Sequence, residues 1–281
     1  MATTTDTFPL VDLTLARRLE RAVGHSNAAF VESRARLEPA VGATWADVDG
    51  TYALFDGVDS PLTQTFGLGM SSTPDGAVLD AIEAFFAERG APTFHEVSPL
   101  ADPSLLSLLA DRRYRPIELT SIIYQPLLRE LPSDPSAGDV TVRRIDGSLA
   151  DEADRWAAVS AEGWAETPEI AEFVRAIGRV NARAADTHCF LAELDGRPIG
   201  AGAMHVHDGV AVLAGASTIP SARRRGGQRA LLAARLRFAR EAGCELATMG
   251  AAPGSASQRN AERQGFRVAY TRIKWERALR S

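Results

Sequence analysis

The amino-acid sequence predicts an α/β protein (an α+β mixed sheet) with two similar units in tandem. In residues 188–218, apolar and polar side chains alternate as they do in strands, and the next residues change to the 3.6-residue period of a helix. Prolines and small polar residues interrupt this periodicity at 128–138, as is typical of a linker. The segments 111–127 and 262–279, at the ends of the two halves, resemble each other when one residue is skipped. We therefore expect a first domain at 1–127, a linker at 128–138 and a second domain at 139–281.

The second domain is expected to begin with helices and to continue with a meander of strands. An alanine-rich helical region covers residues 148–183 and is interrupted at Thr167 and Pro168. Three antiparallel strands follow, separated by two Asp-Gly pairs. An Asp-Gly pair between apolar alternations predicts a hairpin turn, because both central residues of that turn need positive φ. The two turns are expected at 195–196 and 208–209.

A helix and three shorter elements complete the second domain. One face of the helix carries the small or apolar side chains of Gly227, Leu231, Ala234 and Phe238. Gly243 ends this helix, and the remaining elements are a strand at 244–249, a short helix at 257–264 and a final strand at 266–275. The first domain repeats the later part of this plan, with a strand pair at 51–69, a helix at 80–90, a strand at 91–97 and a helix at 102–114.

The composition indicates a soluble protein without a membrane or nucleic-acid partner. Hydrophobic residues make up 45% of the sequence and charged residues 24%, and no apolar run approaches the roughly 20 residues that span a bilayer. The N-terminus shows no secretory signal, so a cytoplasmic location is expected. A formal net charge of -5 disfavours a protein that coats nucleic acid, because such proteins need a basic face. The two cysteines, Cys189 and Cys244, lie in strand-like apolar runs and are expected to be buried thiols.

Arginine and glycine residues at the start of the second-domain helix predict an anion-binding site. Four arginines occur within the seven residues 223–229, directly after a proline-marked turn. A helix N-terminus presents unpaired main-chain N–H groups and a partial positive charge. Gly226 and Gly227 let a ligand approach those N–H groups without a Cβ in the way. Charge and bidentate hydrogen bonds to a phosphate would come from the guanidinium groups of Arg223, Arg224 and Arg225.

This segment resembles the pyrophosphate-binding motif of the GNAT superfamily of N-acetyltransferases, written Q/RxxGxG/A. Arg223, Gly226 and Gln228 fall on its three defined positions, and Gln228 departs from the usual glycine or alanine. The resemblance extends over 139–281, with the same order of elements and a small helix that ends at Gly265 before the last strand. It implies two tandem GNAT-like folds, of which the N-terminal copy is degenerate and the C-terminal copy uses acetyl-CoA.

The resemblance also implies which residues contact the acetyl-CoA. Pantetheine would pair like an added strand in a V-shaped opening between the strand that ends near Thr218 and the parallel strand near Leu246. The short helix that follows would contact the cofactor again, although Ser255 or Ser257 equally suits a helix cap. The expected cofactor-binding residues are therefore Ser217, Thr218, Ile219, Arg223, Arg224, Arg225, Gly226, Gly227, Gln228, Arg229, Ser257 and Asn260.

The base and acid that many GNAT enzymes use are missing from the equivalent positions. Ala214, Gly215 and Ala216 replace a common glutamate, and Ala261 replaces a common tyrosine. Catalysis would then depend on positioning and on main-chain polarisation of the carbonyl, with a base from elsewhere. The candidates are Glu162, Glu166, His205 and Tyr270. A solvent-facing acidic turn is the alternative for the two glutamates. His207 lies on the same side of the strand as His205, and for this pair a solvated strand face is the alternative. No metal site is expected, because no third ligand has a telling spacing, and Cys189 lacks a nearby base that would make it a nucleophile.

The first domain is expected to have lost the cofactor. Its equivalent of the phosphate loop, residues 70–86, contains no arginine, and Asp75 sits where a pyrophosphate would need positive charge. This copy would form one wall of the acceptor pocket or stabilise the pair of domains. His95 and Glu96 are not expected to act as an acid-base pair, because neighbouring strand residues face opposite ways. Core packing is more typical than a substrate-cleft role for the aromatic residues Trp45, Tyr52 and Phe55.

These observations predict an N-acetyltransferase. It would transfer an acetyl group from acetyl-CoA to the amine of a small-molecule acceptor by direct attack in a ternary complex. The missing base and acid leave an alternative, a non-catalytic CoA-binding regulatory or sensor protein. An enzyme that acts on nucleotide phosphates is disfavoured, because no lysine-serine or lysine-threonine pair follows the glycines. The acceptor, the acyl-chain preference and the oligomeric state do not follow from the sequence.

Overall fold

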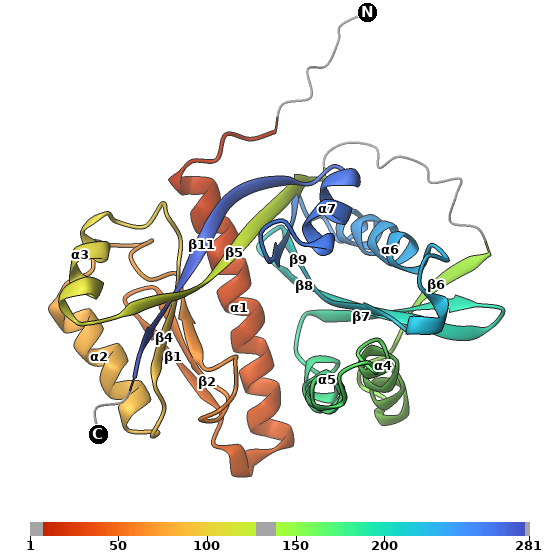
Figure 1. The fold of residues 1–281 in the computed structure, drawn as a ribbon, viewed down its shortest axis with the longest axis horizontal. Coiled ribbons are helices and arrows are strands. Elements are labelled where there is room, and N and C mark those ends of the chain that lie inside the picture. The colour runs from red at the N-terminus through yellow and green to blue at the C-terminus, as the bar shows by residue number, and fades with distance from the viewer. Residues whose placement is uncertain (1–7, 128–138, 279–281) are drawn as a thin grey trace, which may run out of the picture. The chain divides into compact units, whose positions relative to one another are not determined.

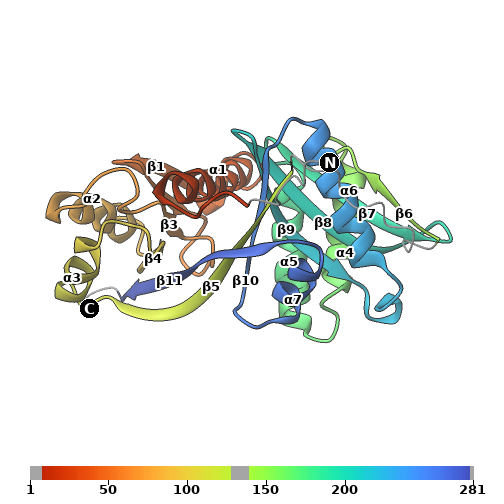
Figure 2. The ribbon, with the colours of Figure 1, turned by 90° about the horizontal axis from the view of Figure 1, so that it is seen from above.

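A computed structural model of the protein describes residues 8–127 and 139–278, and the predicted linker at 128–138 lies outside the described residues. Within the described residues the chain forms seven α-helices, two 3-10 helices and eleven strands (Figure 1, Figure 2). The predicted mixed α/β class is confirmed. The chain divides into two compact units, which we call unit 1 and unit 2. Unit 1 comprises residues up to 24, 46–126 and those from 248 onward, and unit 2 comprises 25–45 and 127–247.

Unit 1 contains a mixed sheet. In spatial order its strands are β1 (Thr44–Val48), β2 (Thr51–Phe55), β3 (Gln64–Phe66), β4 (Thr93–Val97), β11 (Arg267–Arg277) and β5 (Arg115–Pro126). β3 and β4 run parallel, with Thr65 opposite His95, whereas β2–β3, β4–β11 and β11–β5 are antiparallel. The helices of this unit are α2 (Gly76–Ala87), α3 (Ser104–Asp111) and α7 (Ala256–Arg263). Three elements, α1 (Leu13–Leu37), β1 and β10 (Leu246–Ala251), are divided between the units.

The last strand of the chain lies inside the sheet of unit 1. β11 pairs with β4 through Ile273 and Val97, and with β5 through Arg272 and Thr120. Figure 1 shows this blue strand running along the yellow-green strand β5. The predicted final strand is thus confirmed, but both of its neighbours come from the first half of the chain. The division at 1–127 and 139–281 therefore stays a prediction about duplicated segments, because each compact unit draws on both halves.

The apolar core of unit 1 is built by α2 and α3. Leu79, Ile82 and Phe86 recur along one side of α2 and pack with Leu105 and Leu109 of α3. All five side chains are fully buried. Burial of a leucine or phenylalanine side chain contributes about 2 kcal/mol, so these two helices are held to the sheet mainly by this cluster.

Unit 2 contains an antiparallel sheet with the order β9 (Val210–Thr218), β8 (Arg197–His207), β7 (Thr187–Leu194) and β6 (Val140–Arg144). Both predicted hairpin turns are confirmed. Asp195 and Gly196 have φ values of 51° and 73°, and Asp208 and Gly209 have 45° and 71°. Positive φ at both central residues matches the right-handed twist of the strands that the turn connects. These turns fix which residues of β8 face β7 and β9.

Three helices accompany the sheet of unit 2. They are α4 (Ala150–Glu162), α5 (Pro168–Asn181) and α6 (Gly227–Glu241), and a 3-10 turn, η2 (Pro220–Ala222), precedes α6. The predicted break at Thr167 and Pro168 is confirmed, because Pro168 begins α5. The indole of Trp156 on α4 is 2% exposed and donates a hydrogen bond to the Phe190 carbonyl of β7 at 3.1 Å.

Several elements lie outside every predicted one. α1, β1 and β6 belong to this group, and α2 begins four residues before the predicted helix at 80–90. None of the helices within residues 8–127 and 139–278 has the length and apolar character of a membrane-spanning segment.

Candidate cofactor-binding site

The start of α6 presents main-chain N–H groups that no side chain caps. Gly226 is the N-cap residue, and no side chain of the described residues bonds to the first turn as a cap. Gly226 has a φ of 87°, in the left-handed region that glycine adopts without strain, and Arg224 before it has a φ of 66°. The N–H groups of the first turn have no carbonyl partner within their own helix. This helix start is therefore suited to an anion.

Gly227 brings the first turn of α6 close to the sheet. A Cβ atom at this position would lie 3.3 Å from Cδ1 of Ile199 on β8 and 3.9 Å from Cγ2 of Thr218 on β9. The first distance is shorter than ordinary van der Waals contact. The helix start is thus fixed against the end of β9, the strand along which the pantetheine is expected to bind.

Arginine side chains surround this helix start. Arg223, Arg224 and Arg225 are exposed, and Arg229 in the first turn is half-buried. Nη2 of Arg223 lies 2.8 Å from Oε2 of Glu166 and donates to the Gly163 carbonyl at 3.3 Å. This ion pair joins the segment between α4 and α5 to the loop before α6. Because both partners are exposed to solvent, the pair contributes about 0–1 kcal/mol and can be exchanged for a ligand.

The side chain of Gln228 bonds to the end of β9. Its Nε2 donates to the Thr218 hydroxyl at 3.0 Å. Two other predicted cofactor residues also have bonds within unit 2: the Ser217 hydroxyl donates to the Ser160 carbonyl at 2.9 Å, and the Ile219 N–H donates to the Ile199 carbonyl at 3.0 Å. The bonds of Gln228 and Ser217 hold the loop and α4 against β9.

β9 contains a bulge shortly before its end. Its register with β8 moves from Ala203 opposite Ala214 to Ala201 opposite Ser217, so Gly215 and Ala216 have no partner on β8. Gly215 adopts a φ of 59°, which explains why a glycine stands inside this strand. Ala214, Gly215 and Ala216 are exposed despite their small size. The bulge therefore opens the main chain of β9, and its side chains offer neither an acid nor a base.

The sequence of this region matches a known family. Residues 151–266 match the model of the acetyltransferase (GNAT) family. These residues form a GNAT acetyltransferase domain. No curated protein matches the chain in sequence.

Solved structures share the fold over most of the chain. A GCN5-related N-acetyltransferase from Kribbella flavida is 20% identical with a TM-score of 0.63, covering 90% of this chain and 96% of its own. One from Sphaerobacter thermophilus is 17% identical with a TM-score of 0.54, covering 78% and 72%. A tandem GNAT protein from the clavulanic acid biosynthesis pathway is 12% identical with a TM-score of 0.57, covering 100% and 98%. At these identities the similarity shows the fold alone, and with the tandem GNAT protein the shared fold covers the whole chain.

Two candidate catalytic residues of the GNAT domain lie near the α6 loop. Glu162 and Glu166 are exposed, at the end of α4 and in the segment that follows it. This segment approaches β9 closely, since a Cβ atom on Gly163 would lie 2.5 Å from Cβ of Ser217. The structure therefore brings both glutamates to the side of the GNAT domain where α6 begins. Their role in proton transfer stays a prediction.

His205 is placed in the interior of unit 2. It is 2% exposed, its Nε2 lies 3.0 Å from Nδ1 of His25 on α1, and its Nδ1 lies 3.3 Å from the Thr187 hydroxyl. His207 stacks on His25 with ring centroids 3.7 Å apart. Burial, with a smaller contribution from His25, lowers the pKa of His205 to about 4. His205 is thus a buried neutral imidazole, and this position is poorly suited to taking a proton from an amine in solvent.

Tyr270 is placed in the interior of unit 1. Its hydroxyl donates to Oε1 of Glu20 at 2.7 Å, and burial raises the pKa of Tyr270 well above its usual value. Arg272 bonds to both oxygens of Glu20 at 3.1 Å, and Nη1 of Arg272 lies 3.7 Å from Oε2 of Glu96. All of these groups are more than nine-tenths buried. In unit 1, Tyr270 has a structural partner, so a role as general acid stays an untested prediction.

The α7 residues show one cap and two exposed side chains. Ser255 caps α7 by accepting a hydrogen bond from the Gln258 N–H at 3.2 Å. A helix cap was one of the two roles expected for this residue. Ser257 and Asn260 are exposed, and the Asn260 Oδ1 accepts from Arg263 at 3.3 Å. α7 belongs to unit 1, whereas the α6 loop belongs to unit 2. The contribution of Ser257 and Asn260 to a cofactor site stays a prediction.

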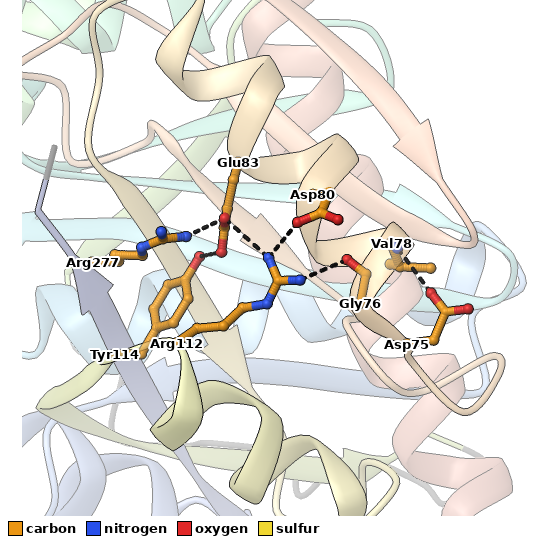
Figure 3. Close-up of polar contacts among 8 residues, drawn as sticks. All are labelled: Asp75, Gly76, Val78, Asp80, Glu83, Arg112, Tyr114 and Arg277. Carbon is orange, nitrogen blue, oxygen red and sulfur yellow. Dashed lines mark hydrogen bonds and ion pairs between the residues drawn. The ribbon is translucent and has the colours of Figure 1, made fainter. Parts of the chain in front are cut away.

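The equivalent helix start in the first half of the chain is occupied by the protein itself. Asp75 caps α2 by accepting from the Val78 N–H at 3.0 Å (Figure 3). Arg112 donates to the Gly76 carbonyl at 2.9 Å and forms ion pairs with Asp80 at 2.7 Å and Glu83 at 3.1 Å. Glu83 also contacts Tyr114 and Arg277. A carboxylate thus stands where a phosphate would bind, and the nearby guanidinium groups already have acidic partners.

The structure also places the two cysteines and the aromatic residues Trp45, Tyr52 and Phe55. Cys189 and Cys244 are buried free thiols, and burial raises the pKa of both. Phe55 belongs to the core of unit 1, as expected, whereas Tyr52 is half-buried and the half-buried Trp45 donates to Glu32 at 2.9 Å. No group of three or more metal ligands occurs within residues 8–127 and 139–278.

His95 and Glu96 have separate surroundings. Nδ1 of His95 lies 2.7 Å from the Thr65 hydroxyl, whereas Glu96 lies beside Arg272. Burial lowers the pKa of His95 to about 3. They do not form an acid-base pair.

Proposed function

We propose that this protein is an acetyl-CoA-dependent N-acetyltransferase that acts on the amine of a small molecule. The observation that carries the proposal is the uncapped start of α6 in the GNAT domain, with Gly226 in the left-handed conformation and arginines on the loop before it. These are the features that a diphosphate requires: main-chain donors, room for close approach, and positive charge.

Two segments of unit 2 would hold the cofactor. Main-chain N–H groups of Gly227, Gln228 and Arg229 would hold the pyrophosphate, and Arg223, Arg224 and Arg225 would neutralise it. Main-chain groups of Ser217 and Thr218 at the end of β9, and the carbonyl of Ile219 just after it, would bind the pantetheine arm, and the exposed bulge lies next to this segment.

The chemistry is a transfer of the acyl group between sulfur and nitrogen. Bound acetyl-CoA would supply a thioester whose carbonyl carbon the neutral amine attacks, so that a C–N bond forms, the C–S bond breaks, and the proton lost by the amine ends on the thiolate or in water. This chain contributes orientation and main-chain donors at the bulge, because Ala214 and Ala216 have no titratable group. Glu162 and Glu166, near the start of α6, would attract the ammonium form of the acceptor and accept its proton.

Calorimetry with acetyl-CoA tests this proposal. We expect one binding site per chain, and a weaker affinity when Arg223 and Arg225 are both replaced by alanine. Absence of binding to the wild-type protein would overturn the proposal.

A second candidate is a CoA-binding regulatory or sensor protein. It is motivated by the lack of acidic and basic side chains at the β9 bulge and at Ala261. The two candidates differ in turnover. An acetyltransferase releases free CoA thiol from acetyl-CoA in the presence of some member of a broad panel of primary amines, whereas a sensor binds acetyl-CoA and releases none.

A further inference from the structure

A guanidinium group is buried inside unit 2 with main-chain carbonyls as its partners. Arg235 of α6 is 3% exposed. Its Nε donates to the Leu231 carbonyl at 3.2 Å, and its Nη1 lies 3.0 Å from the Ala203 carbonyl and 3.4 Å from the Ala214 carbonyl. No carboxylate of the described residues forms an ion pair with it. The group is therefore a positive charge whose field is not cancelled by a neighbouring acid.

Such a charge has a cost in stability. Moving an ion from water into a protein interior is unfavourable, and an apolar side chain of similar size would avoid this desolvation. Burial lowers the pKa of Arg235 to about 10, so the side chain still carries its proton near neutral pH. A buried charge that the fold could replace by a leucine or methionine points to a role other than stability.

The position of Arg235 connects it to the β9 bulge. Ala203 and Ala214 are the pair at which the register of β8 and β9 begins to shift, and Nη1 lies near both of their carbonyls. On β8, Gly202 leaves room for the guanidinium, because a Cβ atom there would lie 3.2 Å from its Cζ. The Ala214 carbonyl belongs to the same peptide group as the N–H of Gly215, the residue with a φ of 59° at the centre of the bulge.

We propose that Arg235 is a positioning residue for acyl transfer, which fixes the β9 bulge and polarises its Ala214–Gly215 peptide group toward the thioester. A carbonyl that accepts from a charged donor polarises its peptide group, and this strengthens the N–H on the other side as a hydrogen-bond donor. Gly215 has no Cα partner in the register of β9 with β8. Its N–H would donate to the thioester oxygen, which gains negative charge as the amine attacks. This role rests on the proposed function, and it supplies electrostatic stabilisation where the chain lacks an acidic or basic side chain.

The infrared spectrum of bound acetyl-CoA tests the role without knowledge of the acceptor. Acetyl-CoA labelled with 13C at the carbonyl would be bound to the wild-type protein and to Arg235→Met, Arg235→Lys and Arg237→Met. Arg237 is an exposed residue of the same helix and serves as the matched control. Affinity by calorimetry and melting temperature would be measured on each protein.

We expect the wild-type protein and Arg237→Met to shift the labelled carbonyl band to lower wavenumber than in free acetyl-CoA. Arg235→Met should lose most of this shift while it binds acetyl-CoA within about threefold of the wild type, because the phosphate contacts remain. Arg235→Lys keeps the charge and should show part of the wild-type shift of the carbonyl band. This comparison of Arg235→Lys with the wild type can be made even if Arg235→Met does not fold.

The outcomes separate the two proposals. If the wild type binds acetyl-CoA, two results would overturn the role of Arg235 alone. One is a carbonyl band in Arg235→Met at the same wavenumber as in the wild type. The other is a carbonyl band in Arg235→Lys at the same wavenumber as in Arg235→Met. No binding of acetyl-CoA to the wild type would overturn the proposed function. A purely structural arginine would change the melting temperature and leave the carbonyl band in place.

Discussion

Two helices of this protein begin after a strand and a turn, yet their N-termini differ in one decisive residue. At α2 the N-cap is Asp75, in an extended conformation, and its carboxylate accepts from the Val78 N–H. At α6 the N-cap is Gly226, in a left-handed conformation, and no side chain of the described residues caps the helix. Both helix starts have the same unpaired donors and the same partial positive charge. At α2 a side chain of the protein accepts from one of these donors, whereas at α6 no side chain of the described residues does so.

The charged residues around the two helix starts follow the same difference. Near α2, Arg112 is held by Asp80, Glu83 and the Gly76 carbonyl (Figure 3). Near α6, Arg224 and Arg225 are exposed, and Arg223 is paired only with an exposed glutamate and a carbonyl. We propose that anion binding at a GNAT-like helix start requires an N-cap without an acceptor side chain, together with exposed arginines.

The largest expected effect comes from making α6 resemble α2. Gly226→Asp places a carboxylate at the N-cap, where it would accept hydrogen bonds from the N–H groups of the first turn and repel a diphosphate. We expect the dissociation constant for acetyl-CoA to rise by about a hundredfold or more, since charge-assisted contacts are lost and replaced by like-charge repulsion. Calorimetry measures this change.

The control for this variant is Gly196→Asp. Gly196 has a similar φ of 73° in an exposed hairpin turn, and a Cβ atom there meets nothing within 4 Å. It carries the same backbone strain of about 1–2 kcal/mol without touching the α6 loop. If both variants weaken acetyl-CoA binding equally, the effect is strain in the fold, and the comparison of the two N-caps loses its explanation.

The second effect concerns the arginines. Replacing Arg223 and Arg225 by alanine should weaken acetyl-CoA binding by about ten- to a hundredfold, because each bond to a charged group contributes about 1.5 kcal/mol or more. The salt dependence of the affinity should also decrease, since fewer charges are neutralised on binding. Titrations at two ionic strengths measure both changes. Arg237→Ala, on the exposed side of α6, should leave affinity and salt dependence unchanged.

The third effect is on stability and concerns α2. Asp75→Ala removes a helix cap and should lower the free energy of unfolding by about 1 kcal/mol. Urea unfolding measures this loss, with Asp111→Ala at the end of α3 as a surface control. The stoichiometry of acetyl-CoA binding should remain one per chain, because the arginine beside α2 stays paired with acids. A second molecule bound to Asp75→Ala would show that the cap alone blocks this helix start.

The smallest effect concerns the ion pair between Glu166 and Arg223. Glu166→Gln removes an acidic partner that a diphosphate must displace, and we expect acetyl-CoA to bind about two- to threefold more tightly, as for other exposed ion pairs. Glu169→Gln, an exposed residue on α5, is the control. Weaker binding in Glu166→Gln would show that this carboxylate holds Arg223 in the orientation that the ligand needs.

Local features of the fold could be predicted because neighbouring residues decide them. The Asp-Gly turns at 195–196 and 208–209 have positive φ at every central residue, and the helix that begins at Gly227 follows its arginine-rich loop as expected. Helix α1 was not predicted although it spans 25 residues, and the predicted helix at 80–90 begins instead at Gly76. Boundaries of this kind depend on a cap such as Asp75 and on contacts that periodicity does not report.

The sequence by itself determined the glycine- and arginine-rich start of α6 and the acidic cap at the equivalent position, Asp75. Both are properties of a few consecutive residues, and they depend on main-chain geometry at a helix start. Only the tertiary structure decided that β11 lies between β4 and β5, that Tyr270 bonds to Glu20, and that Arg235 reaches the β9 bulge. These contacts join residues far apart in the chain, and their energies come from packing and desolvation, which no local pattern encodes.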